Sequence, residues 1–271
     1  MYINPTLLQI CGPIGIRIYG LMIVTGLCLF MYLVLRDERR KQYIPEYVFH
    51  TAFFYGVISG IIGGRLLFFL TEYQWDEGPF QFFKLWEPGF SLLGAVIAIP
   101  PVVTIYLWFK NISSLLFFDI IAVYIPLLQA ISRFGCFGSG CCHGLALDQS
   151  AWWTVMYEHP DSLAPLNIPL HPTQLYSAVA SLILFFLLLL FSRLYSSKRG
   201  FIFGFYLFGE GIARFVVDFF RMRSEYEMTY GLKIFQSHVT YYQGISAIVS
   251  TVGVIMMIIS FVYSEKRASK L

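Results

Sequence analysis

Thiols and an imidazole lie close together in one short segment, Arg133–Gly144, with the sequence RFGCFGSGCCHG. Cys136, Cys141, Cys142 and His143 are side chains of the kinds that bind zinc, and cysteines outside the cytoplasm also form disulfides. The spacing lacks the C-x-x-C pair of common zinc sites and places two cysteines side by side, so we expect no metal. Two interpretations stay open: a disulfide from Cys136 to Cys141 or Cys142, and reduced cysteines that pack as small apolar residues.

The composition is that of a membrane protein. Hydrophobic residues make up 57% of the 271 residues and charged residues 13%, whereas soluble domains carry about 25% charged residues. We predict an all-α integral membrane protein, a single membrane-embedded domain over 1–271. Its seven transmembrane helices are expected at about 15–36, 47–70, 89–109, 113–132, 173–193, 200–219 and 240–263. The net charge of +3, without a basic stripe, argues against nucleic acid as a partner.

Lysine and arginine residues set the expected orientation, because short loops rich in them stay in the cytoplasm. The connections after the odd-numbered helices, together with the C-terminal tail, hold 11 of the 19 basic residues, and the opposite side holds five. The sequence therefore predicts an N-terminus outside the cell, a cytoplasmic C-terminus and an external loop over 133–172. The thiols of the opening segment would then face an oxidising compartment.

Four arginine residues are expected near the outer leaflet. Arg17, beside Tyr19, and Arg65, Arg133 and Arg214 lie in or at the ends of predicted spans, where charged side chains are costly and usually functional. Because a guanidinium group forms paired hydrogen bonds with phosphate oxygens, the cluster predicts a site for an anionic phospholipid head group. Interfacial arginines also extend towards lipid head groups without a specific role, so that alternative stays open.

Other polar residues are expected near the same level. Asp218 follows Arg214 by one helical turn, so the two side chains share a helix face. The glycines of 133–144 are expected to let the backbone approach a lipid head group. His171 is either a proton acceptor or a buried hydrogen-bonding residue. Asp119 lies in the inner part of the fourth predicted helix and is expected to be structural.

Several short motifs, in order along nearly the whole chain, resemble those of the prolipoprotein diacylglyceryl transferase family. The most specific is HPTQLY (171–176), and ARFVVDFFR (213–221) resembles the motif of the sixth span. The others are IRIYGLM (16–22), GGRL (63–66), DIIA from Asp119 followed by RFG (133–135), and YQGIS (242–246).

The resemblance implies transfer of the diacylglyceryl group of phosphatidylglycerol to the cysteine thiol of a lipoprotein signal peptide, with release of glycerol phosphate and with no cofactor. Arg133 and Arg214 would bind the phosphate, and the catalytic group would also include Asp218, Glu210 and His171. The implied partners are phosphatidylglycerol, prolipoprotein signal peptides and membrane lipids, at the outer leaflet of the bacterial inner membrane. Phospholipid contacts are also expected from Arg65, Arg17, Tyr19, Gln174, Tyr176 and Arg221.

The sequence departs from the family pattern at polar positions. Leu93 stands at a typical histidine, Cys136 and Cys141 at an asparagine and a glutamate, Ser177 at a glutamate, and Glu210 at a tyrosine. The identity of the general base is therefore open. Glu210, one turn from Arg214, is a candidate for a relocated carboxylate, and His143 is another.

Two alternatives to this activity remain. The first is a divergent or inactive relative that uses another acceptor. The second is a non-catalytic membrane thiol or metal protein centred on residues 136–143.

Overall fold

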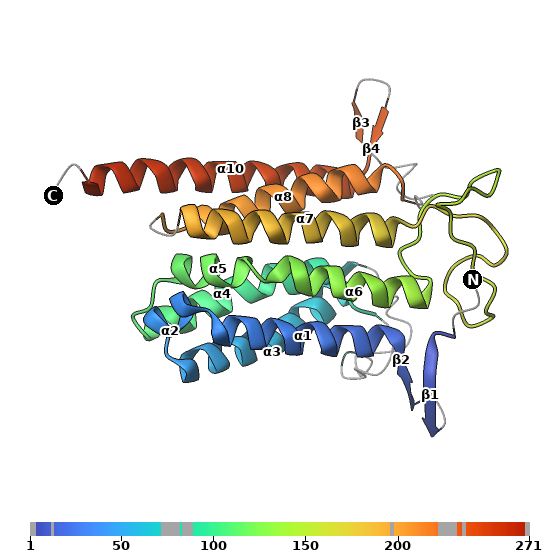
Figure 1. Cartoon of the computed structure of the whole chain (residues 1–271), viewed down its shortest axis with the longest axis horizontal. Coiled ribbons are helices and arrows are strands. Elements are labelled where there is room, and N and C mark those ends of the chain that lie inside the picture. Colours follow the sequence, from blue (N-terminus) through green and yellow to red (C-terminus); the bar gives the residue numbers. More distant parts are fainter. Residues whose placement is uncertain are drawn as a thin grey trace. The chain divides into compact units, whose positions relative to one another are not determined.

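The computed structural model describes residues 4–11, 14–71, 82, 89–195, 198–221, 232–234 and 237–268. The described residues are mainly helical, with two short antiparallel β-hairpins (Figure 1). The elements are β1 (Thr6–Cys11), β2 (Ile14–Arg17), α1 (Ile18–Arg36), α2 (Glu38–Tyr43), α3 (Glu46–Thr71), α4 (Leu92–Phe109), α5 (Ser114–Ala122), α6 (Ile125–Ser139), α7 (Thr173–Leu194), α8 (Phe201–Asp218), β3 (Leu232–Ile234), β4 (Ser237–Val239) and α10 (Tyr241–Ala268).

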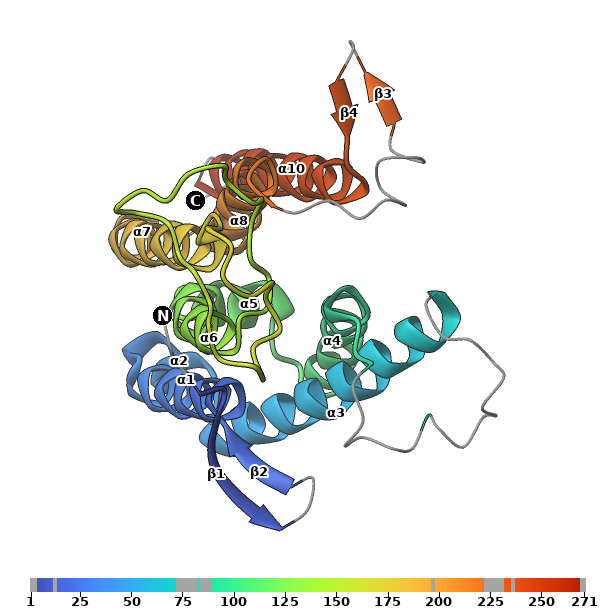
Figure 2. The ribbon, with the colours of Figure 1, turned by 90° about the vertical axis from the view of Figure 1, so that its right-hand side faces the viewer.

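The chain divides into two compact units. The first unit comprises Met1–Val34 and Phe118–Leu271, and the second comprises Leu35–Phe117. In the first unit, α6, α7, α8 and α10 form a row in which each helix contacts the next (Figure 2). The core of this unit includes Ala122, Val123, Leu184, Leu188, Phe201 and Ile202. The prediction of one domain over the whole chain stays a prediction.

Several helices have the length and composition of membrane spans. Four qualify individually, namely α1, α3, α7 and the stretch Tyr242–Val262 of α10, and α5 with α6 makes a fifth if the bent pair is one span. Large apolar side chains remain exposed on them, including Phe186 of α7 and Ile248 of α10. Extensive exposed apolar surface on long helices is what lipid contact requires. The protein is therefore a multi-pass helical membrane protein.

The predicted boundaries hold for most helices but not for the fourth. Two helices, α5 and α6, meet there at an angle of 47°, and α6 continues to Ser139. The helix therefore continues beyond the predicted end of the span at 132, and Arg133 and Cys136 are helical. The hairpin β1–β2 was also not predicted, and it includes Arg17. α8 is a charged helix, since Glu210, Arg214 and Asp218 all lie within it.

Glycine residues allow close helix contacts in both units. In the first, a Cβ atom on Gly138 would lie 2.8 Å from Ile18 Cγ2 of α1, and one on Gly135 would lie 3.1 Å from Tyr19 Cα. In the second, a Cβ atom on Gly63 would lie 2.3 Å from Ala98 Cβ of α4. Small residues at such contacts are how helices associate closely in lipid. Gly135 and Gly138 therefore accommodate α1, and the predicted approach of this segment's glycines to a lipid head group stays a prediction.

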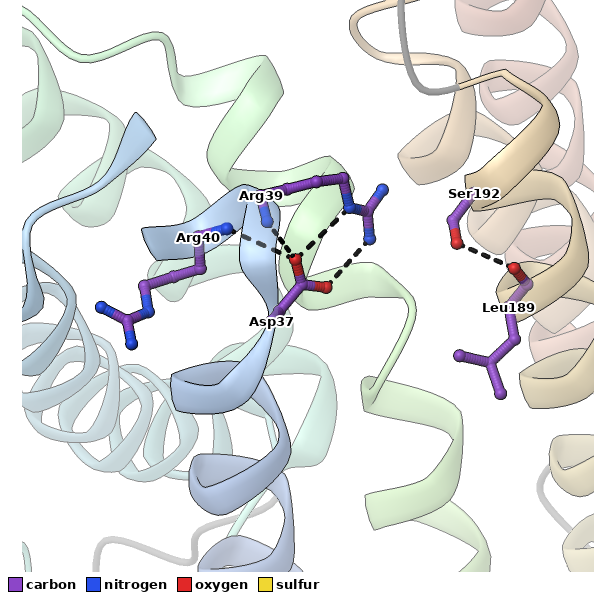
Figure 3. Close-up of polar contacts among 5 residues, drawn as sticks. All are labelled: Asp37, Arg39, Arg40, Leu189 and Ser192. Carbon is purple, nitrogen blue, oxygen red and sulfur yellow. Dashed lines mark hydrogen bonds and ion pairs between the residues drawn. The ribbon is translucent and has the colours of Figure 1, made fainter. Parts of the chain in front are cut away.

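Two helix ends illustrate how short-range hydrogen bonds define these elements. Asp37 caps the start of α2, because its Oδ1 accepts hydrogen bonds from the backbone of Arg39 at 2.8 Å and of Arg40 at 3.3 Å (Figure 3). Near the end of α7, the Ser192 hydroxyl donates to the Leu189 carbonyl at 2.9 Å (Figure 3). A hydrogen bond to a backbone carbonyl offsets the free-energy cost of removing a hydroxyl group from water in an apolar helix.

Asp119 fixes the start of α8, in agreement with its predicted structural role. Its two carboxylate oxygens accept hydrogen bonds from the backbone nitrogens of Gly200 at 2.5 Å and Phe203 at 2.8 Å. Gly200 has a φ angle of 87°, a left-handed conformation that favours glycine. A buried carboxylate is thereby paired with the positive end of the helix that carries Glu210 and Arg214.

Replacing Asp119 tests this cap. We expect Asp119→Asn to lower the free energy of unfolding by about 1–3 kcal/mol, because one acceptor becomes a donor that faces a backbone N–H. Thermal unfolding of the purified variant in detergent measures the effect. Asp148→Asn, at an exposed loop position, serves as the matched control. Equal unfolding temperatures for the two variants would contradict the assignment.

Candidate active site

A small polar pocket lies between α6, α7 and α8, inside the first unit. Each helix contributes residues at intervals of about one turn, which places them on one face. α6 supplies Gln129 and Arg133, α7 supplies Ser177 and Ser181, and α8 supplies Glu210, Ala213, Arg214 and Val217. Of the predicted catalytic residues, Arg133, Arg214 and Glu210 meet here, whereas Asp218 and His171 do not line the pocket.

The pocket carries more positive than negative charge. Arg214 Nε lies 3.5 Å from Glu210 Oε1, which comes one turn earlier on α8. Arg133 forms no hydrogen bond or ion pair with any residue that the structure describes. Two guanidinium groups and one carboxylate therefore line the same pocket. This arrangement suits an additional anion, such as a phosphodiester, that accepts hydrogen bonds from arginine.

Sequence reasoning missed three polar residues of this pocket as site residues. Gln129 precedes Arg133 by one turn, and its Nε2 donates to the Tyr206 hydroxyl at 3.1 Å. Ser177 was recognised only as a departure from the family pattern, and Ser181 not at all. The available signal was the spacing of four residues between Gln129 and Arg133 and between Ser177 and Ser181.

An apolar groove of about 730 Å³ adjoins the polar pocket. It runs between α7 and α8, and Ala213 and Val217 line both spaces. The other lining residues are Trp153, His171, Tyr176, Ala180, Ile183, Leu184, Leu187, Gly209, Ile212, Val216 and Phe220. A polar, positively charged space thus lies next to an apolar one. A lipid likewise has an anionic head group next to apolar hydrocarbon chains.

His171 and Tyr176 line this groove. His171 Nδ1 lies 3.2 Å from the Tyr176 hydroxyl, and its ring centroid lies 5.0 Å from that of Trp153 and 5.4 Å from that of Phe220. These contacts give His171 the structural role that was one of its two interpretations. Its predicted role in catalysis, and the predicted lipid contact of Tyr176, stay predictions.

The N-terminus of α7 holds the cysteine-containing loop in place. Thr173 Oγ1 donates to the Cys142 carbonyl and Gln174 Nε2 donates to the Cys141 carbonyl, both at 2.7 Å. The Tyr157 hydroxyl donates to the Phe137 carbonyl at 2.9 Å and lies 3.5 Å from Gln174 Nε2. Gln174 is buried. Its observed partner is therefore this loop, and its predicted phospholipid contact has no support from these hydrogen bonds.

Three thiols converge at the end of α6. The Sγ atoms of Cys136, Cys141 and Cys142 all lie within 4.8 Å of one another, and all three cysteines are free. Hydrogen bonds with the other two thiols, then the charges of Arg221 and Arg133, hold the pKa of Cys142 below its usual range. The disulfide considered from the sequence is not formed in this structure. His143 is separate, and its Nδ1 lies 3.1 Å from the Gly144 carbonyl oxygen.

Comparison with known proteins decides the family. The family model described as prolipoprotein diacylglyceryl transferase matches residues 5–259. A phosphatidylglycerol–prolipoprotein diacylglyceryl transferase from Clostridium tetani is 33% identical over 218 residues, which cover 80% of this chain and 85% of that protein. The protein of the same name from Janthinobacterium is 31% identical over 272 residues, with 95% and 96% covered. The chain belongs to the prolipoprotein diacylglyceryl transferase family.

Two of the five departures from the transferase pattern lie in the pocket. Ser177 on α7, which stands at an expected glutamate, and Glu210 on α8, which stands at an expected tyrosine, both line it. A carboxylate thus remains in the pocket but projects from α8 instead of α7. This placement agrees with the interpretation of Glu210 as a relocated carboxylate. Leu93 lies on α4 in the second unit.

Asp218 of the transferase motif has a structural partner. The Thr240 hydroxyl donates to Asp218 Oδ2 at 2.5 Å. Thr240 and Gln243 also bond each other's backbone nitrogens with their side-chain oxygens, at 3.0 and 3.1 Å, which is a capping box at the start of α10. Asp218 therefore joins the end of α8 to the start of α10. Arg214, which precedes Asp218 by one turn, pairs instead with Glu210.

Arg65 of the GGRL motif is buried in the second unit. Its Nη1 donates to the Gly89 carbonyl at 2.6 Å and its Nε to the Phe82 carbonyl at 3.3 Å. Its guanidinium carbon lies 5.3 Å from the centroid of the Phe69 ring. These contacts give Arg65 a structural function in that unit. Its predicted contact with phospholipid stays a prediction.

The remaining candidates lie around the end of the first unit. Arg17 ends β2 and is exposed, and Tyr19 begins α1. Arg221 follows α8, and its backbone forms an antiparallel bridge with Gly144 of the thiol loop. None of the three lines the polar pocket, so their predicted lipid contacts stay predictions.

Proposed function

We propose that the chain transfers the diacylglyceryl group of phosphatidylglycerol to the thiol of a cysteine in a prolipoprotein signal peptide. The observation that carries the proposal is the convergence of Arg133 and Arg214 on a polar pocket that adjoins an apolar groove. Phosphatidylglycerol offers a phosphodiester for the arginines and hydrocarbon chains for the groove. The family relationship supports the same substrates.

In the proposed reaction the peptide sulfur attacks the glyceryl carbon that bears the phosphate oxygen. A carbon–sulfur bond forms, the carbon–oxygen bond breaks, and glycerol phosphate leaves with the bonding electrons. Arg133 and Arg214 stabilise the negative charge that the leaving phosphate gains. The thiol must lose its proton, since the thiolate is the nucleophile.

Glu210 is the proposed acceptor of that proton. It is the carboxylate of the polar pocket and lies beside Arg214. Protonation of Glu210 would also free Arg214 from its ion pair as the phosphate gains charge. Proton transfer and charge stabilisation are then coupled through one side chain.

The proposed topology has seven transmembrane helices in the bacterial inner membrane, with the site towards the outer leaflet. Beyond the spans described above, it requires α4 and α8 to cross the bilayer as well. The excess of basic residues on the side of the C-terminus supports this orientation. Signal peptides and phosphatidylglycerol would both reach the site from the membrane.

Reporter fusions test the orientation. A reporter active only in the cytoplasm is expected to work when fused after Leu271 and to fail when a truncated chain carries it after Asp148. A reporter active only outside the cytoplasm should show the opposite pattern, because the two positions lie on opposite sides. The reverse result at both positions would refute the outer-leaflet site.

The two arginines are tested by Arg133→Lys and Arg214→Lys. Each is expected to reduce transfer by about 100-fold or more, because an ammonium group keeps the charge but cannot form the paired hydrogen bonds. Complementation of a strain depleted of its own diacylglyceryl transferase, at equal protein level, measures the effect. Arg193→Lys, at an exposed position near the end of α7, should complement fully. Full activity of both pocket variants would remove the phosphate-binding assignment.

Moving the carboxylate across the pocket tests Glu210. Glu210→Gln is expected to lower the initial rate of transfer by about 100-fold. Adding Ser177→Glu should restore part of that rate, because both positions line one pocket. Rates measured on purified protein across a pH series give the comparison, with Asp148→Asn as control. An undiminished rate in Glu210→Gln would exclude Glu210 as the proton acceptor.

A further inference from the structure

We propose that Cys136, Cys141 and Cys142 together bind one thiophilic metal ion through their three sulfur atoms. Zinc(II) and copper(I) are the ions of this class, since both favour thiolate ligands. The proposal is independent of the transfer reaction, because none of the three cysteines lines the polar pocket or the groove.

The distances among the sulfur atoms fit one ion. Two sulfurs bound to a tetrahedral zinc ion lie about 3.8 Å apart, given a Zn–S distance of about 2.3 Å. All three Sγ atoms already lie within 4.8 Å of one another. Small side-chain rotations would therefore bring them into coordination. A water molecule or an external ligand would take a fourth position on zinc.

The backbone removes the objection that adjacent cysteines rarely bind one ion. Gly140, which follows the last residue of α6, has a φ angle of 75°, and Cys142 has a φ angle of 57°. A left-handed conformation at a non-glycine residue costs energy and persists only where the surroundings impose it. These two turns bring the sulfurs of Cys141 and Cys142 back towards Cys136 on the helix. The sequence spacing alone could not show this reversal.

The loop is also fixed before any ion binds. The carbonyls of Cys141 and Cys142 accept hydrogen bonds from Gln174 and Thr173 at the start of α7. Gln174 Oε1 is a buried acceptor without a partner among the described residues. The side chain that holds Cys141 thus keeps one acceptor unused. Hydrogen bonds around a metal site, such as those from Gln174 and Thr173 to the loop, orient the metal ligands and raise the affinity for the metal.

Nearby cations offset the negative charge that such a site carries. Three thiolates and one zinc ion have a net charge of −1, and with copper(I) it is −2. Arg133 precedes Cys136 by one helical turn, and the backbone of Arg221 pairs with Gly144, two residues after Cys142. The ion would join the end of α6, the helix that carries Arg133, to the loop that holds Cys141 and Cys142.

Metal titration of the full chain tests the proposal. Protein purified in detergent with a non-thiol reductant, and stripped by a chelator, is titrated with cobalt(II), which shows a thiolate charge-transfer band, and then with zinc(II). A separate titration uses copper(I) against a coloured chelator. We expect one ion to bind per chain in at least one of the two titrations, the one with cobalt(II) and zinc(II) or the one with copper(I). Cys136→Ser and Cys142→Ser should weaken binding by about 10-fold or more, and Cys28→Ser, an exposed cysteine of α1, should leave it unchanged.

Two measurements keep the test decisive if a serine variant folds poorly. In the wild-type protein, saturating metal should protect Cys136, Cys141 and Cys142, but not Cys28, from alkylation detected by peptide mass. Metal should also raise the unfolding temperature, because it binds only the folded state. No stoichiometric binding in either arm, unchanged affinity in folded serine variants, or a disulfide among these cysteines in protein purified without reductant would overturn the proposal.

Discussion

Two arginine side chains and a single carboxylate line one pocket within a bundle of apolar helices, and the first unit holds these unbalanced charges in place. Arg214 pairs with Glu210, while Arg133 has no polar partner among the described residues. Cations held close together in a poorly hydrated site repel each other unless an anion joins them. The pocket therefore favours binding of an anion in a part of the unit that is otherwise apolar. A membrane phospholipid supplies that charge together with chains that match the adjoining groove.

The fold meets this constraint by fixing the helices that carry the charges. α8 is fixed at both ends by aspartate residues, since Asp119 caps its start and Asp218 binds Thr240 beyond its end. α6 is held against α1 by contacts at Gly135 and Gly138. Its C-terminal end is joined to α7 through the hydrogen bonds of Gln174 and Thr173 to the loop. Charged groups that repel each other thus remain in position because the backbone around them is rigid.

Much of this could be predicted from the sequence. The apolar segments gave most helix positions to within a few residues, and the arginine spacing pointed to Arg133 and Arg214. Asp119 was expected to be structural because it lies deep in an apolar segment, and the structure confirms it. The resemblance to known transferases rested on motifs whose family the comparisons bear out.

The parts that sequence reasoning missed depend on contacts between distant segments. The bend between α5 and α6 and the extension of α6 to Ser139 have no signal in hydropathy, because the helix continues through glycine and cysteine. Asp218 follows Arg214 by one turn, yet its partner is Thr240, 22 residues later. Gln174 is buried against a loop that precedes it by 33 residues. The three thiols converge because Gly140 and Cys142 adopt left-handed conformations. Glycine permits such a conformation but does not require it, and cysteine rarely adopts it, so the sequence did not predict it.

Transfer by the purified protein tests the central claim most directly. The protein, reconstituted with phosphatidylglycerol, is mixed with a synthetic signal peptide that contains one cysteine, and peptide mass and free glycerol phosphate are measured together. We expect the peptide to gain one diacylglyceryl group for each glycerol phosphate released. A peptide with serine in place of the cysteine should remain unmodified, and an uncharged diacylglycerol should not replace phosphatidylglycerol. An unmodified cysteine peptide, with native protein and intact lipid, would contradict the account.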